Sequence, residues 1–160
     1  MMHFKIKNVV VLGSGVMGSG IACHLANVGL KVLMLDILPS NLSPDEKDNS
    51  KLRNSVAQTA LDKSIKSKPA PLYKKSYSNR ISVGNFEDHF ENINEADWII
   101  EVVVERLDIK KMIFEKVEKY RKSGSYVSSN TSSIPIAFLA EGRSDAVSYT
   151  HLTLPTNREV

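Results

Sequence analysis

Three glycines with the spacing G-x-G-x-x-G form the first pattern in the chain that indicates chemistry. They follow the apolar run 9–12 directly and precede a segment with helical spacing. In that setting the first glycine permits a tight turn, the second lets the backbone approach a pyrophosphate, and the third lets a helix pack closely on a strand. The six residues that we expect to line a phosphate-binding turn are Gly13, Ser14, Gly15, Val16, Met17 and Gly18.

An acidic residue at the end of the next apolar run supports the same interpretation. Asp36 closes the run 31–36 and lies eighteen residues after Gly18. A carboxylate at this position accepts hydrogen bonds from the adenine ribose of a dinucleotide and repels a 2′-phosphate. The pattern therefore predicts a site for NAD in preference to NADP. The alternative is a domain of the same architecture in which the glycines serve only close packing.

The segments around these residues predict a β-α-β unit. We expect a strand over 4–12, a helix over 16–28 that ends at Gly29, and a second strand over 31–36. On the helix, Met17, Ile21, Leu25 and Val28 recur at the spacing of one apolar face. Runs of β-branched apolar residues are typical of strands that are buried on both faces of a parallel sheet.

A helical excursion is predicted between the second and third strands. A polar loop over 39–49 leads into apolar residues spaced for one helix over 52–65. The segment Lys68-Pro69-Ala70-Pro71 should end this helix, because proline lacks the amide hydrogen and disfavours helix in the residue before it.

The second half of the chain continues the alternation of strands and helices. The expected elements are a short strand over 81–83, a long strand over 96–104, a helix that Asp108 caps and Gly124 ends, a strand over 126–129, and a last helix with Pro135 in its first turn. The apolar face of the long helix should carry Ile109, Met112, Ile113, Val117 and Tyr120. The chain thus predicts an α/β fold: a Rossmann-type, doubly wound, mostly parallel sheet with a helical excursion after the second strand.

The composition describes one ordinary globular domain. Of the 160 residues, 42% are hydrophobic and 24% are charged, which suits a single core. The apolar runs fall far short of the roughly 20 residues that cross a bilayer, and the first residues lack a signal-peptide pattern, so no membrane insertion is expected. The single cysteine, Cys23, excludes an internal disulfide and a multi-cysteine metal site. We predict a cytoplasmic protein without a metal.

The net charge of +3 is small, but basic residues cluster in one segment. The cluster consists of Lys63, Lys66, Lys68, Lys74, Lys75 and Arg80. It could hold an acidic ligand, although a solvated helix face and loop is the favoured interpretation. Nucleic-acid binding is not supported, because no stacking pattern of aromatic residues or DNA-binding motif accompanies these lysines.

Longer motifs in the second half carry a resemblance to a known family. Residues 96–105 (ADWIIEVVVE), 129–133 (SNTSS) and 141–145 (EGRSD) resemble the 3-hydroxyacyl-CoA dehydrogenases of fatty-acid β-oxidation. The resemblance extends from the glycine turn to Asp145 and is closest to the long bacterial forms in which a hydratase-type module follows the dehydrogenase. It implies hydride transfer from a 3-hydroxyacyl-CoA substrate to NAD, a 3-ketoacyl-CoA product, and a homo-oligomeric intact protein.

The resemblance also implies roles for single residues. Glu105 and Lys110 would lie beside the nicotinamide ribose, and Asn130 and Ser132 match the family's Asn-Thr-Ser-Ser turn, with Ser132 contacting the substrate and the catalytic histidine. From the residues alone, this turn indicates a helix N-cap, and the charged residues Glu105 and Lys110 indicate a solvated surface. Possible counterparts of the family's coenzyme A contacts are Lys63, Lys66 and Lys68.

The resemblance breaks after Asp145. The family continues to Thr-His-Phe-Phe-Asn-Pro, whose histidine is the general base, whereas residues 147–156 resemble the translation of a DNA adapter used in sequencing libraries. We therefore expect an incomplete NAD-binding domain over 1–146, a non-native tail over 147–160, and no catalytic histidine. His151 is an alternative base, but it is not favoured, because Phe-Phe-Asn-Pro does not follow it.

Two other functions remain open from the sequence. One is a different Rossmann dehydrogenase that acts on a small hydroxy acid. The other is an NAD-binding fragment without catalysis, which is how the chain as written should behave. Turnover assays separate these alternatives.

Overall fold

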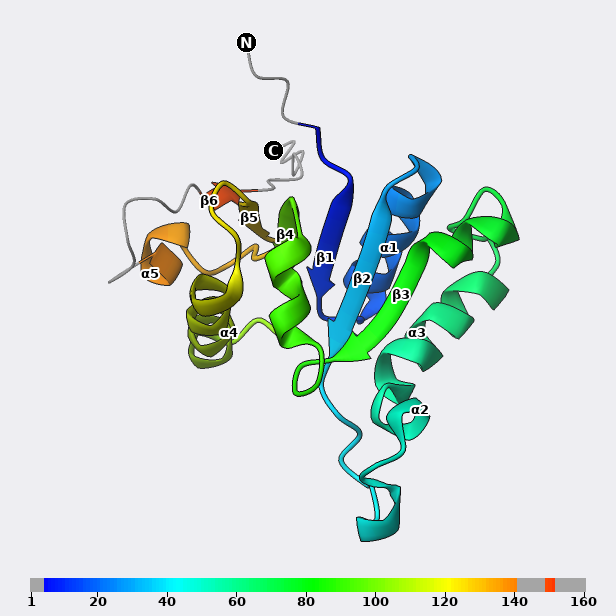
Figure 1. Cartoon of the computed structure of the whole chain (residues 1–160). Coiled ribbons are helices and arrows are strands. Elements are labelled where there is room, and N and C mark those ends of the chain that lie inside the picture. The colour runs from blue at the N-terminus through cyan, green and yellow to red at the C-terminus, as the bar shows by residue number, and fades with distance from the viewer. Residues whose placement is uncertain (1–4, 141–148, 152–160) are drawn as a thin grey trace, which may run out of the picture.

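A parallel sheet is the centre of this computed structural model, which describes residues 5–140 and 149–151 (Figure 1). The order of the described strands is β3-β2-β1-β4-β5-β6, and every pairing between neighbours is parallel. In this order the chain starts in the middle of the sheet and winds outward in both directions. The arrangement confirms the predicted Rossmann-type, doubly wound fold.

Five of the described strands overlap the strands predicted from the sequence, but β1 begins at Asn8 instead of residue 4, and β6 was not predicted. Their bounds are β1 Asn8–Leu12, β2 Lys31–Asp36, β3 Ile81–Asn85, β4 Trp98–Glu101, β5 Tyr126–Ser129 and β6 Tyr149–His151. The strand predicted over 96–104 is shorter than expected. It ends at Glu101, whose side chain accepts a hydrogen bond from the amide of Val103 at 2.7 Å as the chain leaves the sheet.

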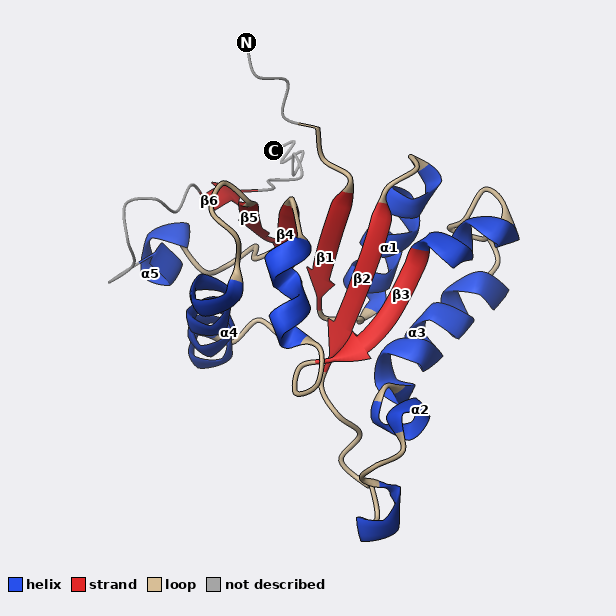
Figure 2. Cartoon of the chain, in the orientation of Figure 1, coloured by secondary structure: helices blue, strands red, loops and turns tan. Residues whose placement is uncertain are grey.

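Helices cover both faces of the sheet (Figure 2). The α-helices are α1 Val16–Asn27, α2 Ser50–Arg53, α3 Ser55–Lys66, α4 Leu107–Tyr120 and α5 Ile136–Ala140, and single 3-10 turns span Pro44–Glu46, Lys75–Arg80 and Phe90–Glu95. Helices α1 and α3 pack on one face, and α4 and the turn 90–95 pack on the other. None of the described helices is long and apolar enough to span a bilayer.

The core consists of two apolar clusters, one on each side of the sheet. Alternate residues of β1 point to opposite faces, so Val9 and Val11 join the cluster under α1 and α3, while Val10 and Leu12 join the cluster under α4. All four side chains are at most 3% exposed. The continuous apolar run of the sequence is therefore the signature of a central strand with no solvent-facing side.

Helix α1 contacts the sheet with smaller side chains than the sequence predicted. Met17 and Val28, which were expected on the apolar face, are 46% and 62% exposed. The buried face consists mainly of Ala22, Cys23 and Ala26, each 0% exposed. Small side chains let the helix backbone approach β1 and β2 closely, so the large residues at the helix ends remain outside. Burial raises the pKa of Cys23, as suits a packing residue.

The helical excursion is divided into two helices where one was predicted. Asn54 separates α2 from α3, and Asn49 caps α2 by accepting the amides of Lys51 and Leu52. The α3 helix ends at Lys66, just before the proline-rich segment that was expected to stop it.

The predicted start of α4 was wrong by two positions. Arg106 occupies the N-cap position, and Asp108 lies in the first turn, where it pairs with Arg106 at 2.6 Å. Met112 is 56% exposed, because the helical period turns Lys110, Ile113 and Val117 toward the sheet instead.

Candidate functional site

The glycine turn between β1 and α1 has the form of a phosphate cradle. Gly13 has a φ of +111°, and a Cβ there would lie 2.5 Å from the carbonyl oxygen of Val102. A Cβ at Gly18 would lie 1.9 Å from the carbonyl oxygen of Gly13. Gly15 differs, because its Cβ would meet no atom within 4 Å. Gly13 and Gly18 are therefore required by the fold, whereas Gly15 leaves open space in front of the helix.

The open space lies at the amino end of α1. The helix begins at Val16, and Gly15 at the N-cap position has no side chain with which to satisfy the first amides. No acidic residue occupies the first turn. Free amides and the positive end of the helix dipole attract an anion, so the turn fits the pyrophosphate of a dinucleotide.

Asp36 lies beside this turn at the end of β2. One of its oxygens, Oδ2, accepts the amide of Ser14 at 2.6 Å and the hydroxyl of Ser14 at 2.5 Å, and Oδ1 accepts the amide of Ile37 at 2.7 Å. These bonds fix the carboxylate, and Oδ1, which has one donor, retains capacity for a further one. The residues present therefore fit an adenine ribose as well as a pyrophosphate.

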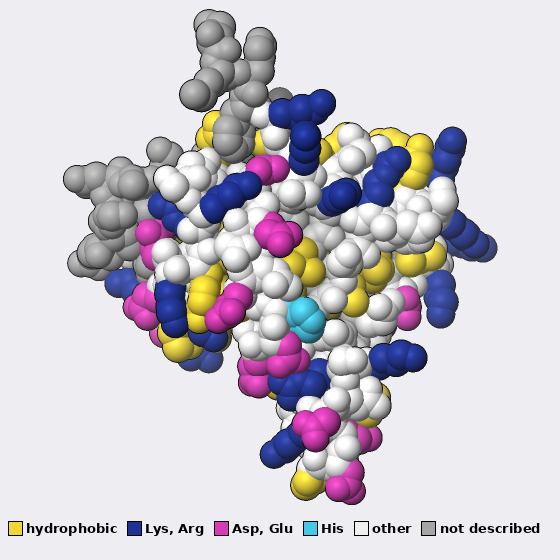
Figure 3. All heavy atoms as spheres, viewed as in Figure 1, with side chains coloured by type: hydrophobic (Ala, Val, Ile, Leu, Met, Phe, Trp, Pro, Cys, Tyr) yellow, Lys and Arg dark blue, Asp and Glu magenta, His cyan; other side chains and the backbone are white. Residues whose placement is uncertain are grey.

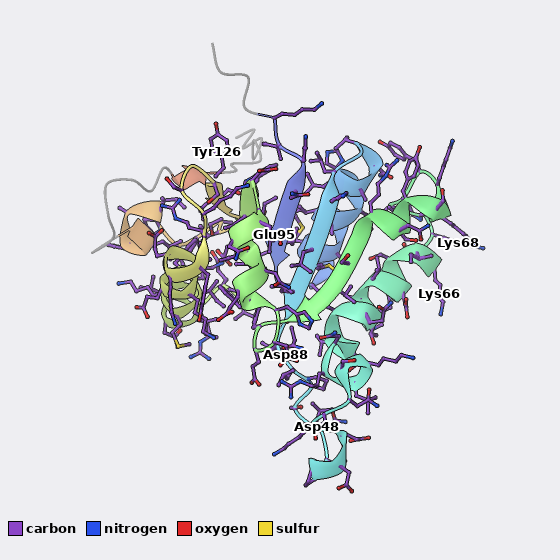
Figure 4. All side chains as sticks on the ribbon, in the orientation of Figure 1. Asp48, Lys66, Lys68, Asp88, Glu95 and Tyr126 are labelled. Carbon is purple, nitrogen blue, oxygen red and sulfur yellow. The ribbon has the colours of Figure 1, made fainter. Side chains whose placement is uncertain are left out.

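A cleft of about 770 Å³ extends from the turn between α1 and α3. Its walls include Gly15, Asp36, Thr59 and Lys63. The neighbouring basic side chains gather along the edge formed by α3 and the turn 75–80 (Figure 3). Lys66 and Lys68 are exposed at the end of α3 and point into solvent (Figure 4). Of the three lysines considered as coenzyme A contacts, Lys63 is the one that lines the cleft.

A buried ion cluster lies at the ends of β4 and β5. The ammonium of Lys110 is 2.7 Å from Oε1 of Glu101 and 3.2 Å from Oε2 of Glu105. It also donates to the carbonyl oxygen of Val103 at 3.3 Å. The side chains of Lys110 and Glu101 are 1% and 0% exposed. Charges this deeply buried persist only when they are paired and hydrogen-bonded.

Glu105 joins this cluster to the turn after β5. Its Oε1 accepts hydrogen bonds from the hydroxyl of Thr131 at 2.5 Å, the amide of Ser132 at 3.1 Å, and the amide and hydroxyl of Ser133 at 3.0 and 2.9 Å. Burial alone raises the pKa of Glu105, but the bonds from Thr131 and Ser133 outweigh it and lower the pKa to about 2. Glu105 is therefore a fixed carboxylate at neutral pH.

The structure arranges the predicted site residues in two groups. Residues 13–18 and Asp36 form the first group, at the ends of β1 and β2. Glu105, Asn130 and Ser132 lie in the second, where the amide of Asn130 donates to the carbonyl of Glu101 and Ser132 is exposed. Gly13 packs against Val102, so the two groups adjoin. Lys110 lies behind Glu105 and not on the surface of the site.

Two residues of the second group were missed by sequence reasoning. Glu101 and Ser129 are both fully buried and bonded to each other. A signal for Glu101 was present, because a charged residue interrupts the apolar run of a strand that is buried on both faces. Ser129 carried no such signal, since serine is common at the ends of strands.

Several predictions concern the end of the chain. The motif 141–145 and most of the tail predicted over 147–160 lie outside the described residues. The described part, β6, pairs with β5 and places the backbone of His151 opposite Ser129. Among the described residues, no three His, Cys, Asp or Glu side chains group in a way that could hold a metal ion.

The sheet order, the glycine turn, the free helix terminus and the acid at the end of β2 together define a Rossmann-type dinucleotide-binding domain. Comparison with known proteins identifies the family. The family model described as "3-hydroxyacyl-CoA dehydrogenase, NAD binding domain" matches residues 8–157, and the chain belongs to this family. Membership confirms both the predicted resemblance and NAD as the cofactor of this domain.

Individual relatives agree with the family. The chain is 53% identical over 150 residues to a probable 3-hydroxyacyl-CoA dehydrogenase of Bacillus subtilis, covering 90% of the chain and 19% of the relative. A protein of the same description from Deinococcus radiodurans is 41% identical over 141 residues, covering 88% of the chain and 38% of the relative. The crystal structure of (S)-3-hydroxybutyryl-CoA dehydrogenase from Ralstonia eutropha is similar, with a TM-score of 0.64 and 28% identity. The match covers 92% of the chain and 48% of that protein. The chain thus spans less than half the length of each of these proteins.

Proposed function

We propose that this chain is the NAD-binding part of a dehydrogenase that oxidises 3-hydroxyacyl-CoA to 3-ketoacyl-CoA in fatty-acid β-oxidation. Family membership supports the reaction class, and the names of the relatives support the substrate class. The observation that carries the proposal is the open turn at Gly15 with Asp36 fixed beside it. We further propose that the intact protein is a cytoplasmic homo-oligomer that binds no nucleic acid.

Each group of the site has a role in this proposal. The amides at the start of α1 bind the pyrophosphate, with the backbone of Ser14 to Gly18 in contact, and Asp36 accepts the adenine ribose hydroxyls. Glu105, with Lys110 paired behind it, and Asn130 would hold the nicotinamide ribose. The bound NAD supplies the acceptor for a hydride from the substrate carbon. Ser132, exposed beside this position, would contact the substrate, and Lys63 would contact a coenzyme A phosphate.

The cofactor site is tested by calorimetric titration of the chain with NAD and NADP. We expect NAD to bind more tightly than NADP, because the Asp36 carboxylate repels a 2′-phosphate. Asp36→Ala should weaken NAD binding about tenfold, as expected for lost hydrogen bonds to a charged group, and should reduce the preference over NADP. Asp45→Ala, which removes an exposed acid in the 3-10 turn nine residues further along the chain, is the matched control. A folded chain that binds neither cofactor would contradict the proposal.

A second candidate is cofactor binding without catalysis. The fact that the chain spans only 19% of one relative and 38% of another favours this behaviour for the polypeptide as written. Absorbance of NADH during incubation with 3-hydroxybutyryl-CoA separates the two candidates. We expect no turnover, because the residues after Thr150-His151 differ from the family's catalytic segment. Measurable turnover would assign full dehydrogenase activity to this chain.

A further inference from the structure

Exposed lysines gather at the corner of the molecule where α3 ends and the chain leads into β3. The segment 63–86 contains five lysines and one arginine but no acidic residue. Within the part of the chain that the structure describes, no carboxylate forms a salt bridge with any of these lysines, whereas Arg53, Lys110 and Lys122 are each paired with an acid. Four of the lysines, all exposed, form what we call the basic corner: Lys66, Lys68, Lys74 and Lys75.

Two apolar side chains are exposed beside the basic corner. Tyr73 is 79% exposed and Val28 is 62% exposed. The side chain of Asn27 holds them together, because it donates to the carbonyl oxygen of Pro71 at 2.8 Å and accepts the amide of Tyr73 at 2.9 Å. Leu72 is 6% exposed and belongs to the core. The loop is therefore fixed with Leu72 inside and the Tyr73 ring in solvent.

The basic corner lies at the end of the sheet opposite the candidate cofactor site (Figure 1). Its loop leads into the start of β3, whereas the glycine turn and Asp36 lie at the ends of β1 and β2. Because these strands are parallel, their starts share one edge of the sheet and their ends share the other. Lys66 and Lys68 point away from the sheet (Figure 4). A flat surface can therefore contact the corner while the glycine turn stays open.

The composition of the basic corner indicates the kind of partner. Its cations are all lysines, whose compact, strongly hydrated charges impose no fixed geometry on an anion, and lysine is depleted in structured protein interfaces. Arg80 is already occupied, because it donates to the carbonyl oxygen of Ala26 at 2.6 Å and its guanidinium lies 4.1 Å from the centre of the Tyr77 ring. A fluid array of anionic headgroups suits such lysines, and an exposed tyrosine is typical of the interface between membrane and water.

We propose that the basic corner binds the surface of an anionic lipid membrane, with the Tyr73 ring and the Val28 side chain in the headgroup layer. The lysines supply the attraction to the lipid phosphates, and the two apolar side chains add contact area that a dissolved anion does not offer. Contact of this kind needs no helix that spans the bilayer, and none is found among the described helices. The inference does not depend on the proposed cofactor site.

Sedimentation with lipid vesicles tests the proposal on the 160-residue chain. We expect the chain to sediment with vesicles of mixed phosphatidylcholine and phosphatidylglycerol and not with vesicles of phosphatidylcholine alone. Lys74→Gln with Lys75→Gln should lower the partition coefficient about 25-fold, because each lysine near an anionic surface contributes about fivefold. Lys47→Gln with Lys51→Gln removes the same charge from exposed positions beside Asp48, far from the corner (Figure 4), and should change it by less than about twofold.

A fluorescent label reports whether the corner itself meets the lipid. Tyr73→Cys is labelled with nitrobenzoxadiazole, while the native Cys23 is 0% exposed and stays unlabelled. We expect the emission to shift to the blue on phosphatidylglycerol vesicles, because the probe leaves water for the headgroup layer. The same label on Asp45→Cys, an exposed position in the turn 44–46, should show no shift. Tyr73→Ser should weaken sedimentation about threefold through the lost apolar contact.

The other outcomes overturn the proposal. Equal loss in the two double variants would show that only net charge matters, and a shift of both labels would show that the corner is not the contact. Equal sedimentation with both kinds of vesicle, or with neither, would remove the anionic lipid surface as the partner. Binding to polyglutamate or duplex DNA that Tyr73→Ser abolishes would assign the corner to a protein or a nucleic acid.

Salt provides a test that needs no variant. Circular dichroism checks that each variant is folded, and if one is not, sodium chloride is added to the unmodified chain on phosphatidylglycerol vesicles. We expect sedimentation to fall as salt rises, because dissolved ions screen exposed charges. Sedimentation that persists at high salt would overturn the role of the lysines.

Discussion

Two glycines of helix α1 differ in the space that surrounds their Cβ positions. Gly18 leaves no room for a side chain, because its Cβ position lies 1.9 Å from one backbone oxygen and 2.9 Å from the adjoining carbon. Gly20, two residues further along the same helix, has no atom within 4 Å of its Cβ position. The fold therefore requires glycine at position 18 and only tolerates it at position 20.

Alanine substitutions should reveal this difference directly. Gly18→Ala should lower the free energy of unfolding by about 2–3 kcal/mol, because the added methyl forces α1 away from β1. Gly20→Ala should raise it by about 0.5–1 kcal/mol, since alanine is the better helix former. Urea unfolding followed by circular dichroism measures both. A tolerated Gly18→Ala would mean that the turn is less tightly packed than the structure indicates.

At the scale of elements, an arginine at the end of α2 joins the start of the helical excursion to the turn after β3. Arg53 binds Asp88 through two nitrogens at 2.6 and 2.7 Å and donates to the carbonyl of Lys47 at 3.0 Å. Asp88, in the turn after β3 (Figure 4), also accepts a hydrogen bond from the side-chain amide of buried Asn85. The hydrogen bond from Arg53 is the largest of the effects that lower the pKa of Asp88 to about 2. A bidentate pair of this kind fixes orientation as well as distance.

Removing the arginine should free α2 without unfolding the sheet. In Arg53→Ala we expect amide exchange in α2 to become about tenfold faster, while exchange in β1 and β4 stays slow. Lys51→Ala removes the same charge from an exposed position on the same helix and should leave the exchange unchanged. Hydrogen exchange read by mass spectrometry checks both variants. Equal exchange in α2 of the two variants would show that the ion pair does not hold the excursion.

For the whole molecule, acid stability depends on carboxylates that hold separate parts of the chain together. Asp97 accepts the amides of Lys7 and Asn8 at 2.8 and 2.9 Å and the ammonium of Lys122 at 2.7 Å, so it joins the start of β1 to the end of α4. Lys122 first, and then the amide of Asn8, lower the pKa of Asp97 to about 2. The unfolded chain has an ordinary aspartate, with a pKa near 3.9.

The sign of the pH dependence follows from this difference. A carboxyl whose pKa is lowered by folding contributes its full stability above pH about 4 and loses it as the pH falls to about 2. Asp97→Asn should therefore reduce the free energy of unfolding at pH 7 by about 1–2 kcal/mol and weaken its fall between pH 4 and 2. Asp45→Asn is the exposed control. Denaturant titrations between pH 4 and 2 measure this fall. If the free energy of unfolding of both variants falls as steeply as that of the unmodified chain, the role of Asp97 is contradicted.

Much of this architecture is encoded in local sequence patterns. The apolar runs, the glycine turn and Asp36 are each local, and the structure confirms the sheet and the turn they predicted. The start of α4 and the burial of Lys110 were not predictable in the same way, because they depend on packing against β4. The partners of Glu101 illustrate the difficulty, since Lys110 is 9 residues away and Ser129 is 28 residues away. A pattern along the chain does not report such contacts.

The two groups of site residues come from separate parts of the chain. The cradle and Asp36 belong to β1-α1-β2, and the second group belongs to β4-α4-β5 and the turn after β5, with the helical excursion and β3 between them. If the two groups recognise the adenine and nicotinamide ends as proposed, each recognition can change by independent mutation. An engineer could exchange residues 8–36 to alter cofactor preference and leave the reactive end untouched, provided that Gly13 still fits against Val102.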